Sequence, residues 1–486
     1  MIVYRPRIGG PERPGPDLGD LARQDASDRA VVVSSAEVYG VHHSNPGRML
    51  ESRQPLRSGN SVQQAWLDYE ELARKKWPAD RLAILRCAPV ITRDGRDFYS
   101  DMFRSDRAFV LPGHVGILQL LHPDDYEEAI RCASANFEPG VYNIAPAGSI
   151  PLDAALELAG VSRIPFPRLA QYAIRGMMQG KAWPADQLEY IRYQWTVSGE
   201  LAQRKFGFTP KYTSAQTLKP DTNRTFDEYG MDIPYIQRWG RGGFNILHKH
   251  YWRIETRGLA NIPKTGKAVL TGVHRGFMPF DATMILDTCM KSVGRGPRFL
   301  IHPCLVKMPG LNNAMTRWGG MIANQENADW VLNRGELLGV YPEGIRGAFA
   351  MYKDAYKLKR FGRDDYVRLA IRHRAPIVPF VTVGHVEIYP ILGRIDIPAF
   401  NRWTEWPFCP ITPTWPLLPV PLPSKWHTEF LPQVDLSAHP PEAADDNALV
   451  KRIGEDIKGS MQDAIDRLLA ARKGIFTGTI FQGELS

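Results

Sequence analysis

Three segments in the second half of the chain combine residue types that can do acid–base or binding chemistry. In the first, TGVHRGFMPFDA, an apolar run ends at His274, and Asp281 follows seven positions later. A carboxylate that holds one imidazole nitrogen stabilises the charge that the ring gains when its other nitrogen takes a proton. The pair therefore predicts a general base. A histidine and an aspartate at this spacing also occur by chance, so a structural histidine is the alternative interpretation.

The second segment, GVYPEGIRGAF, places Glu343 and Arg346 directly after an apolar stretch. Open α/β sheets bind ligands at the carboxyl ends of their strands, and an arginine there can hold a phosphate with two hydrogen bonds. The segment predicts a binding site, and a turn with a weak surface ion pair is the alternative. In the third segment a basic run, Lys357–Arg363, precedes a predicted helix and strand. Either this run is a solvated face, or it binds an anionic headgroup or the phosphates of coenzyme A.

These segments lie among apolar runs that alternate with predicted helices, which is the pattern of a parallel α/β sheet. A helix is expected around Phe244–Trp252. The strands expected in this half are Ala268–Val273, Arg298–His302, Glu336–Pro342 and Pro376–Gly384. Glu343 and Arg346 would then lie at the carboxyl edge of this sheet.

Two further stretches complete the second half. Residues 396–424 hold many prolines and tryptophans, and proline at that density excludes regular helix and central strand. An ordered loop or an exposed surface lobe is therefore expected there. From Asp446 to Arg472 apolar residues recur at helical spacing, which predicts a closing amphipathic helix. Core packing is the simplest account of that apolar stripe.

The first half has an α/β pattern of its own. A buried strand is expected at Ala30–Val33, a helix at Val62–Lys76 and a second apolar strand at Leu82–Val90. Between Lys219 and Gly243 the pattern dissolves. The predicted organisation is an irregular segment at 1–28, a Rossmann-like parallel-sheet domain at 29–218, a linker at 219–243 and a second α/β domain at 244–475.

Composition narrows the classes of protein. A chain of 486 residues with 44% hydrophobic and 23% charged residues suits two or three folded domains. Its net charge of +8 suits anionic partners, but no basic cluster interleaved with aromatics indicates nucleic-acid binding. The five cysteines are scattered and form no CxxC, which argues for a reducing compartment and against a disulfide framework or a zinc site. With neither a signal-peptide pattern nor a run of about 18 apolar residues, a cytoplasmic location is expected.

In this order and at these intervals, the three chemical segments resemble the glycerolipid acyltransferase family, over about residues 235–435. Within that family they are most similar to the lysophospholipid and monoacylglycerol or diacylglycerol types. The family's His and Asp fall on His274 and Asp281, its F-P-E-G-[ST]-R block falls on Tyr341–Arg346, and its V-P-I-V-P strand falls on Ala375–Phe380.

The resemblance implies transfer of a fatty acyl group from acyl-CoA or an acyl-carrier protein to a lipid hydroxyl, with His274 as base and Asp281 behind it. It also implies substrate binding by a set of four residues and peripheral contact with the cytoplasmic face of a membrane. That set is Glu343, Gly344, Arg346 and Arg275. No cofactor and no metal is expected.

This sequence departs from the family pattern at two places. Pro279 stands where the family's aspartate is usual, so Asp281 has to act from a loop that is longer by two residues. Asn324, Gln325 and Glu326 stand where an arginine normally follows the second block. The missing arginine favours a less charged acceptor than lysophosphatidic acid, or an acceptor that is held differently.

The first half resembles the extended short-chain dehydrogenases of the nucleotide-sugar epimerase and dehydratase type, over about residues 29–215. Ser35 in SSAEVYG falls on the catalytic serine, and Arg86 falls on a strand residue near the substrate pocket. The glycine-rich cofactor turn is missing, since no helix is expected after Gly9–Gly10. Tyr69 lacks the family's lysine, because Ala73 stands in its place. We therefore expect a truncated, non-catalytic Rossmann domain that does not bind NAD.

Two alternatives to the acyltransferase are open at this point. One is an NAD-dependent oxidoreductase of nucleotide sugars with an accessory lipid domain. The other is a non-catalytic lipid-binding scaffold, which the shifted aspartate and the missing arginine favour. An intact His274 and the PEGIR run count against the scaffold.

Overall fold

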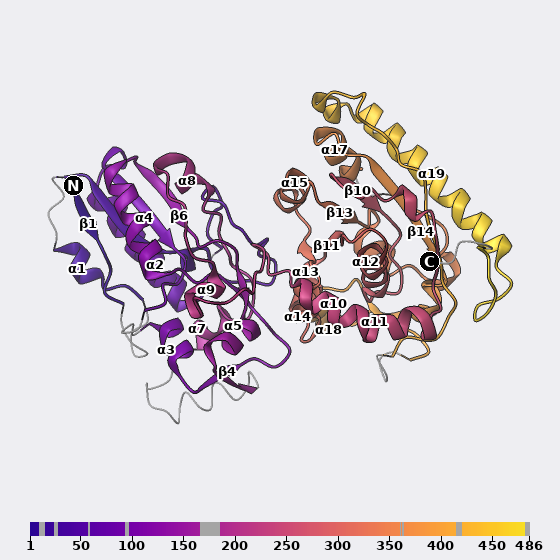
Figure 1. The fold of residues 1–486 in the computed structure, drawn as a ribbon, viewed down its shortest axis with the longest axis horizontal. Coiled ribbons are helices and arrows are strands. Elements are labelled where there is room, and N and C mark those ends of the chain that lie inside the picture. The colour runs from indigo at the N-terminus through magenta and orange to yellow at the C-terminus, as the bar shows by residue number, and fades with distance from the viewer. Residues whose placement is uncertain are drawn as a thin grey trace. The chain divides into compact units, whose positions relative to one another are not determined.

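The computed structural model describes residues 1–8, 15–23, 28–56, 59–92, 97–165, 185–359, 361, 364–414 and 420–481. The chain divides into two compact units (Figure 1). Unit 1 holds Met1–Asp232 and Leu305–Arg317, and unit 2 holds Ile233–Cys304 and Trp318–Ser486. The boundary falls inside the predicted linker at 219–243, but Ile233–Arg241 in that stretch is a helix, α10.

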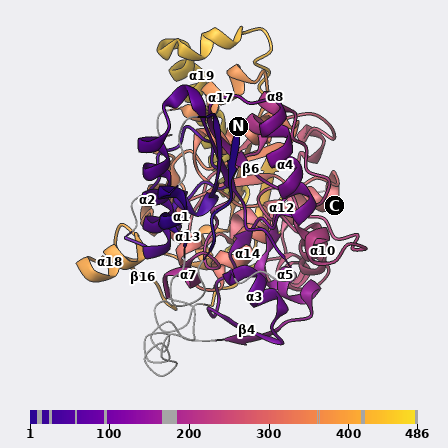
Figure 2. The same cartoon turned by 90° about the vertical axis from the view of Figure 1, so that its left-hand side faces the viewer.

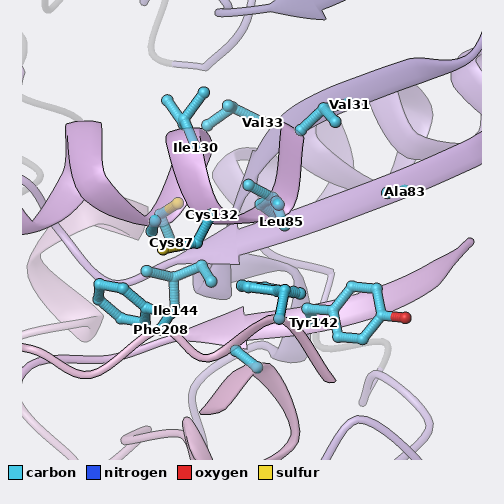
Figure 3. Packing of buried hydrophobic residues seen from close by; sticks show 14 of the residues in the cluster. Val31, Val33, Ala83, Leu85, Cys87, Ile130, Cys132, Tyr142, Ile144 and Phe208 are labelled. Atoms are coloured by element: carbon cyan, nitrogen blue, oxygen red, sulfur yellow. The ribbon is translucent and has the colours of Figure 1, made fainter. Parts of the chain in front are cut away.

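Unit 1 is built on a parallel sheet with the strand order β1-β2-β3-β6. Its central strands are buried along almost their whole length, as expected for a parallel sheet covered on both faces. Side chains of these strands, Val31 and Leu85 among them, pack with Ile130 and Phe208 (Figure 3). The strands are β1 (Ile2–Tyr4), β2 (Ala30–Ser35), β3 (Leu82–Cys87) and β6 (Gly140–Ile144). The predicted Rossmann-like parallel sheet is confirmed.

Helix α2 (Ser61–Lys76) packs against β2 and β3, and α4 (Pro123–Ala135) packs against β2. Other helices that the structure describes in this unit are α1 (Leu18–Ala22), α3 (Phe98–Arg104), α5 (Leu152–Ala159), α7 (Ala185–Glu189), α8 (Glu200–Phe206) and α9 (Ser214–Leu218). Short strand pairs join β4 (Arg107–Val110) to β8 (Ser162–Pro165) and β5 (Ile117–Leu118) to β7 (Ile150–Pro151).

The prediction that residues 1–28 are irregular is wrong at two places, β1 and α1. Strand β1 is too short to show a period and exists because it pairs with β2. Helix α1 starts at a cap, where the Asp17 side chain accepts a hydrogen bond from the Gly19 amide. Gly9 and Gly10 lie outside the described residues.

A segment of the second half of the sequence belongs to unit 1. It carries the end of α13 (Pro303–Lys307) and α14 (Leu311–Arg317). The Arg317 guanidinium lies 2.5 Å from carboxylates of both Asp153 and Asp232. The Val115 amide donates to the Asn312 side chain over 3.0 Å. The predicted domain boundaries had placed this segment in the second domain, 244–475.

Unit 2 is built on a larger sheet with the strand order β12-β11-β13-β10-β14-β17-β9. Its pairs are parallel except for β14 with β17. The strands are β9 (Glu255–Arg257), β10 (Ala268–Thr271), β11 (Arg298–Ile301), β12 (Met321–Ile322), β13 (Leu337–Val340), β14 (Ile377–Val383) and β17 (His427–Phe430). The four strands predicted in this half are confirmed as β10, β11, β13 and β14.

The closing helix is also confirmed as α19 (Asn447–Ala471), which packs against β14. Its stripe, with Ile453, Ile457 and Met461, is buried, so that stripe serves core packing. The helix expected around Phe244–Trp252 is instead α11 (Gly243–Ile246) followed by a π-helical turn. Other helices of the unit are α12 (Phe280–Ser292), α15 (Gln325–Asn333), α16 (Gly344–Ala348) and α17 (Asp365–Arg372).

Within the proline-rich stretch 396–424 the prediction of no regular helix is wrong, because α18 (Pro398–Thr404) lies there. Pro398 occupies the first turn of α18, where a missing backbone N–H costs nothing. Around α18 the strands β15 (Gly393–Ile395) and β16 (Cys409–Ile411) form an antiparallel pair. Across the described ranges, no helix combines the length and the apolar character that a bilayer crossing requires.

Candidate active site

The central strand β10 places His274 at the carboxyl edge of the unit 2 sheet. β10 pairs with β13 and β14, so its end is held from both sides. Gly272 is needed just before the histidine, because a Cβ there would lie 2.1 Å from the Phe380 ring. The chain then turns back through Gly276 and Phe277, whose φ angles are +80° and +42°, before α12 begins. Asp281 lies in the first turn of α12.

This loop brings His274 and Asp281 together. The imidazole Nδ1 lies 2.8 Å from Oδ2 and 3.0 Å from Oδ1 of Asp281. The amides of Arg275 and Ala282 also donate to this carboxylate, over 3.3 and 2.7 Å. Because the Asp281 side chain is 4% exposed and the His274 side chain is 15% exposed, the carboxylate lies behind the ring. Nε2 is then the nitrogen that can exchange a proton with a bound molecule.

Tyr341 supports the imidazole from one face. Its ring stacks on His274 with the centroids 5.2 Å apart and the planes at 28°. On Phe299 it stacks at 5.2 Å and 13°, and Phe380 meets it edge-on at 6.0 Å. Burial raises the pKa of Tyr341 well above its ordinary value, so the phenol stays neutral. The motif singled out Tyr341, but its spacing alone did not reveal this stack.

Two of the predicted substrate-binding residues form an ion pair with each other. The guanidinium of Arg275 lies 2.6 Å from the Glu343 carboxylate, and both side chains are buried. Arg275 also donates to the carbonyl oxygens of Ala355 and His274, over 2.6 and 2.8 Å. The other Glu343 oxygen accepts from the Lys359 amide over 3.0 Å. These bonds connect the His274 loop to the segment after β13, and substrate binding by Arg275 and Glu343 stays a prediction.

Gly344 and Arg346 are exposed at the start of α16. Gly344 has a φ of +57°, which turns the chain from Glu343 into the helix. Within the part of the chain that the structure describes, the Arg346 side chain has no hydrogen-bond or ion-pair partner. Arg346 is therefore available to an anionic ligand in a way that Arg275 is not, and its role also stays a prediction.

The residues in place of the usual second-block arginine serve α15. The Asn324 side chain accepts from the Asn327 amide over 2.8 Å and caps the helix. Gln325 donates to Asp329 one turn later, over 3.0 Å. In the basic run Lys357–Arg363, Arg360, Gly362 and Arg363 lie outside the described residues.

One residue near the site was not predicted. His385 follows β14 and is 1% exposed. Burial lowers its pKa to about 4, against an opposing effect of the Asp281 carboxylate, so the ring is neutral near pH 7. A neutral imidazole here adds no charge beside Asp281 and Arg275. A lone histidine after a strand carries no motif by which the sequence could have shown it.

Unit 1 has a cavity of about 580 Å³ near the carboxyl ends of β2 and β3. Glu37 lies in its wall, and its carboxylate accepts from Gln187 at 2.7 Å, Trp66 at 2.9 Å and Tyr99 at 3.1 Å. Burial raises the pKa of Glu37. Ser35, predicted from the dehydrogenase resemblance, also lines this cavity and caps the turn that contains Glu37.

The other residues singled out in the first half are tied to neighbours or buried. Arg86 is held by Glu70 through two hydrogen bonds of 2.9 and 2.8 Å. Burial raises the pKa of Tyr69, whose side chain is 1% exposed. Over the described ranges, no group of three or more His, Cys, Asp or Glu side chains is arranged to hold a metal ion.

Comparison with known proteins gives three further findings. The acyltransferase family model matches residues 253–383, an interval that contains all six predicted site residues. An uncharacterized protein of Mycobacterium leprae is 33% identical over 260 residues, which cover 52% of this chain and 70% of the relative. A Bos taurus protein described as a "DGAT1/2-independent enzyme synthesizing storage lipids" is 26% identical over 169 residues, 34% of this chain and 49% of that protein.

Among solved structures, MoeE5 in complex with UDP-glucuronic acid and NAD is similar to this chain with 19% identity and a TM-score of 0.31. The likeness covers 40% of this chain and 63% of MoeE5.

Proposed function

This chain belongs to the acyltransferase family, and we propose that it transfers a fatty acyl group from acyl-CoA or an acyl-carrier protein to a hydroxyl of a glycerolipid or lysophospholipid. The observation that carries the proposal is the hydrogen bond between His274 Nδ1 and Asp281, at the carboxyl edge of the unit 2 sheet. It orients a base at the edge where α/β sheets bind ligands.

In the proposed reaction, His274 Nε2 takes the proton of the acceptor hydroxyl. The acceptor oxygen attacks the thioester carbonyl and forms a tetrahedral intermediate. The carbon–sulfur bond then breaks, the ester remains on the acceptor, and the thiolate takes the proton back from the imidazolium. Asp281 stabilises the imidazolium between these steps, and no covalent enzyme intermediate is needed because the acceptor is the nucleophile. General base catalysis of this kind contributes about 10²- to 10⁴-fold.

Arg346 and Gly344 would bind the substrate beside the base. An exposed guanidinium can hold a phosphate of the donor or of the acceptor through paired hydrogen bonds. The acceptor we favour is a neutral or weakly charged glycerolipid, since Asn324 and Gln325 stabilise a helix where an arginine is usual. The storage-lipid description of the Bos taurus relative supports the same choice. We place the reaction at the cytoplasmic face of a membrane, where such acceptors reside.

The test is an acyl transfer assay with labelled acyl-CoA and a panel of acceptors: monoacylglycerol, diacylglycerol and lysophospholipids. His274→Ala should lower kcat by about 10³-fold, within the range for loss of a general base. His250→Ala, which removes an exposed histidine of the same unit, is the matched control and should leave kcat unchanged. Equal transfer by wild type and His274→Ala would rule out the mechanism. Arg346→Ala should raise KM for the donor or the acceptor while leaving the unfolding transition in place.

A further inference from the structure

Exposed apolar side chains gather on one small part of unit 2, residues 392–411, which we call the lobe. Five large side chains of the lobe are between two-fifths and two-thirds exposed. They are Leu392 at 60%, Ile395 at 48%, Ile397 at 41%, Trp403 at 63% and Ile411 at 42%. Exposed apolar residues that occur singly are normal on a protein surface, but a group of this kind marks an interaction site.

The backbone of the lobe holds these side chains outward. In the β15–β16 pair, Gly393 lies opposite Ile411 and Ile395 lies opposite Cys409, so Ile395 and Ile411 share one face. In α18, Phe400 turns inward and meets the Trp406 ring at 5.8 Å, whereas Trp403 points away from the unit. Of the elements of the lobe, Figure 2 labels α18, which is drawn as an orange helix, and β16.

The inner side of the lobe reaches the loop of the candidate active site. Trp406 is 4% exposed, and its ring lies 5.3 Å from Phe277 and 5.2 Å from Phe349. Phe277 belongs to the turn between His274 and Asp281, and Phe349 follows α16, which carries Arg346. Ring contacts from Phe400 through Trp406 therefore connect the lobe to the loop after His274 and to the end of α16.

The lobe carries two arginines and two acidic residues, Asp396 and Glu405, so its formal charge is balanced. Arg394 and Arg402 are exposed between the apolar side chains, and the Arg394 guanidinium lies over the Phe408 ring at 6.0 Å. Asp396 accepts a hydrogen bond from Asn401 within the lobe. Arginine side chains can extend toward lipid phosphates while tryptophan and aliphatic groups enter the interface below them.

We propose that the lobe is the surface by which unit 2 docks on a phospholipid bilayer, which would bring the loop that carries His274 close to the membrane that holds the lipid acceptor. This inference rests on the proposed function for its substrate, but the docking itself can be measured without activity. Because the lobe carries both arginines and carboxylates, insertion of apolar side chains contributes most of the binding, and anionic lipid adds to it.

Vesicle flotation tests the docking. Wild type should float with vesicles of phosphatidylcholine, and more strongly when phosphatidylglycerol is added. The triple variant Ile395→Ser, Trp403→Ser, Ile411→Ser should partition at least about tenfold less, because three apolar side chains no longer leave water. The matched control, Ile246→Ser with Phe476→Ser, removes side chains that are 59% and 56% exposed elsewhere on unit 2 and should float like wild type. Thermal unfolding of each variant shows that it is folded.

Three outcomes would overturn the proposal: no flotation of wild type, equal flotation of wild type and the triple variant, or equal loss in the control. Sedimentation gives a fourth, since a wild-type oligomer that the triple variant dissociates without any vesicle binding would make the lobe a protein interface. His274→Ala should float like wild type, so an inactive base and a lobe that does not dock give different results.

The triple variant also has a kinetic signature. Its activity on an acceptor embedded in vesicles should fall by about tenfold, in proportion to the lost partition. Its activity on a short-chain acceptor dispersed as monomers should match that of wild type, because the His274–Asp281 pair is unchanged. An equal fall on both acceptors would mean that the substitutions disturb the site through Trp406, and docking would not be supported.

Discussion

Each unit of this protein has a carboxylate near the carboxyl ends of its parallel strands, but the two carboxylates have different partners. In unit 2, Asp281 accepts from His274 Nδ1, and within the described residues the second ring nitrogen makes no hydrogen bond. In unit 1, Glu37 accepts from Gln187, Trp66 and Tyr99. The Trp66 indole and the Gln187 amide nitrogen are donors only, and the Tyr99 phenol is not a base near pH 7.

The comparison separates a buried carboxyl beside a cavity from a carboxyl that orients an imidazole. Unit 1 has a cavity of about 580 Å³ beside Glu37, and burial raises the pKa of that carboxyl. Shifted pKa values mark structural networks as well as functional sites. What unit 2 adds is a titratable ring placed between the carboxylate and the surface.

The largest effect should follow from Asp281→Asn. An asparagine in this place can stabilise the wrong imidazole tautomer and cannot neutralise the imidazolium, so kcat should fall by about 10³-fold or more. Glu37→Gln, the equivalent change in unit 1, should leave kcat unchanged. Steady-state kinetics with one donor and one acceptor measures both. The contrast between the two units disappears if both substitutions lower kcat equally.

The next largest effect should be a loss of stability when the buried cation at Arg275 is removed. Arg275→Met leaves the Glu343 carboxylate buried without its 2.6 Å partner, which costs about 3–5 kcal/mol of the free energy of unfolding. Urea unfolding measures this cost. The double variant Arg275→Met, Glu343→Gln should recover part of it, because the uncompensated charge is gone. If the double variant is no more stable than the single one, the packing of Arg275 matters and its charge does not.

The parts of this arrangement that the sequence predicted are those that local pattern carries. Continuous apolar runs predicted β10, β13 and β14, because strands buried on both faces contain little else. His274 and Asp281 were paired on type and spacing, although Pro279 displaced the carboxylate from its usual position. The turn through Gly276 and Phe277 explains how a loop longer by two residues still returns Asp281 to the ring.

The parts that were missed depend on contacts between residues far apart in the sequence. Arg317 joins unit 1 through Asp153 and Asp232, and no local pattern marks such a pair. Arg275 and Glu343 were predicted to bind substrate separately, whereas in the structure they bind each other. The hydrogen bonds that surround Glu37 come from three different helices, so SSAEVYG alone could not show them.

A smaller effect should separate the ring of Tyr341 from its hydroxyl. Tyr341→Leu removes the stack on His274 and should lower kcat by about tenfold, a cost of about 1.4 kcal/mol in the transition state. Tyr341→Phe keeps the stack and should retain wild-type kcat. The pH profile of kcat/KM is the second readout, since only a loss of imidazole positioning should move the limb that belongs to the base. A Phe variant as slow as the Leu variant would assign the effect to the hydroxyl.

The smallest effect concerns the pH dependence of stability and returns to Glu37. Its pKa in the folded protein is raised, so the folded state holds this proton more tightly than the unfolded state does. Wild type therefore loses stability as pH rises from the ordinary glutamate pKa to the folded value. Glu37→Gln has no such proton at this position. As pH rises through that window, the variant should therefore gain stability relative to wild type, and above the window the difference in unfolding free energy should stay constant. Urea unfolding at a series of pH values measures the difference, and a constant difference would mean that its three donors hold Glu37 as an ordinary carboxylate. If the difference is constant, Glu37 and Asp281 are both ordinary carboxylates, and the two units differ only in the group that donates a hydrogen bond to the carboxylate.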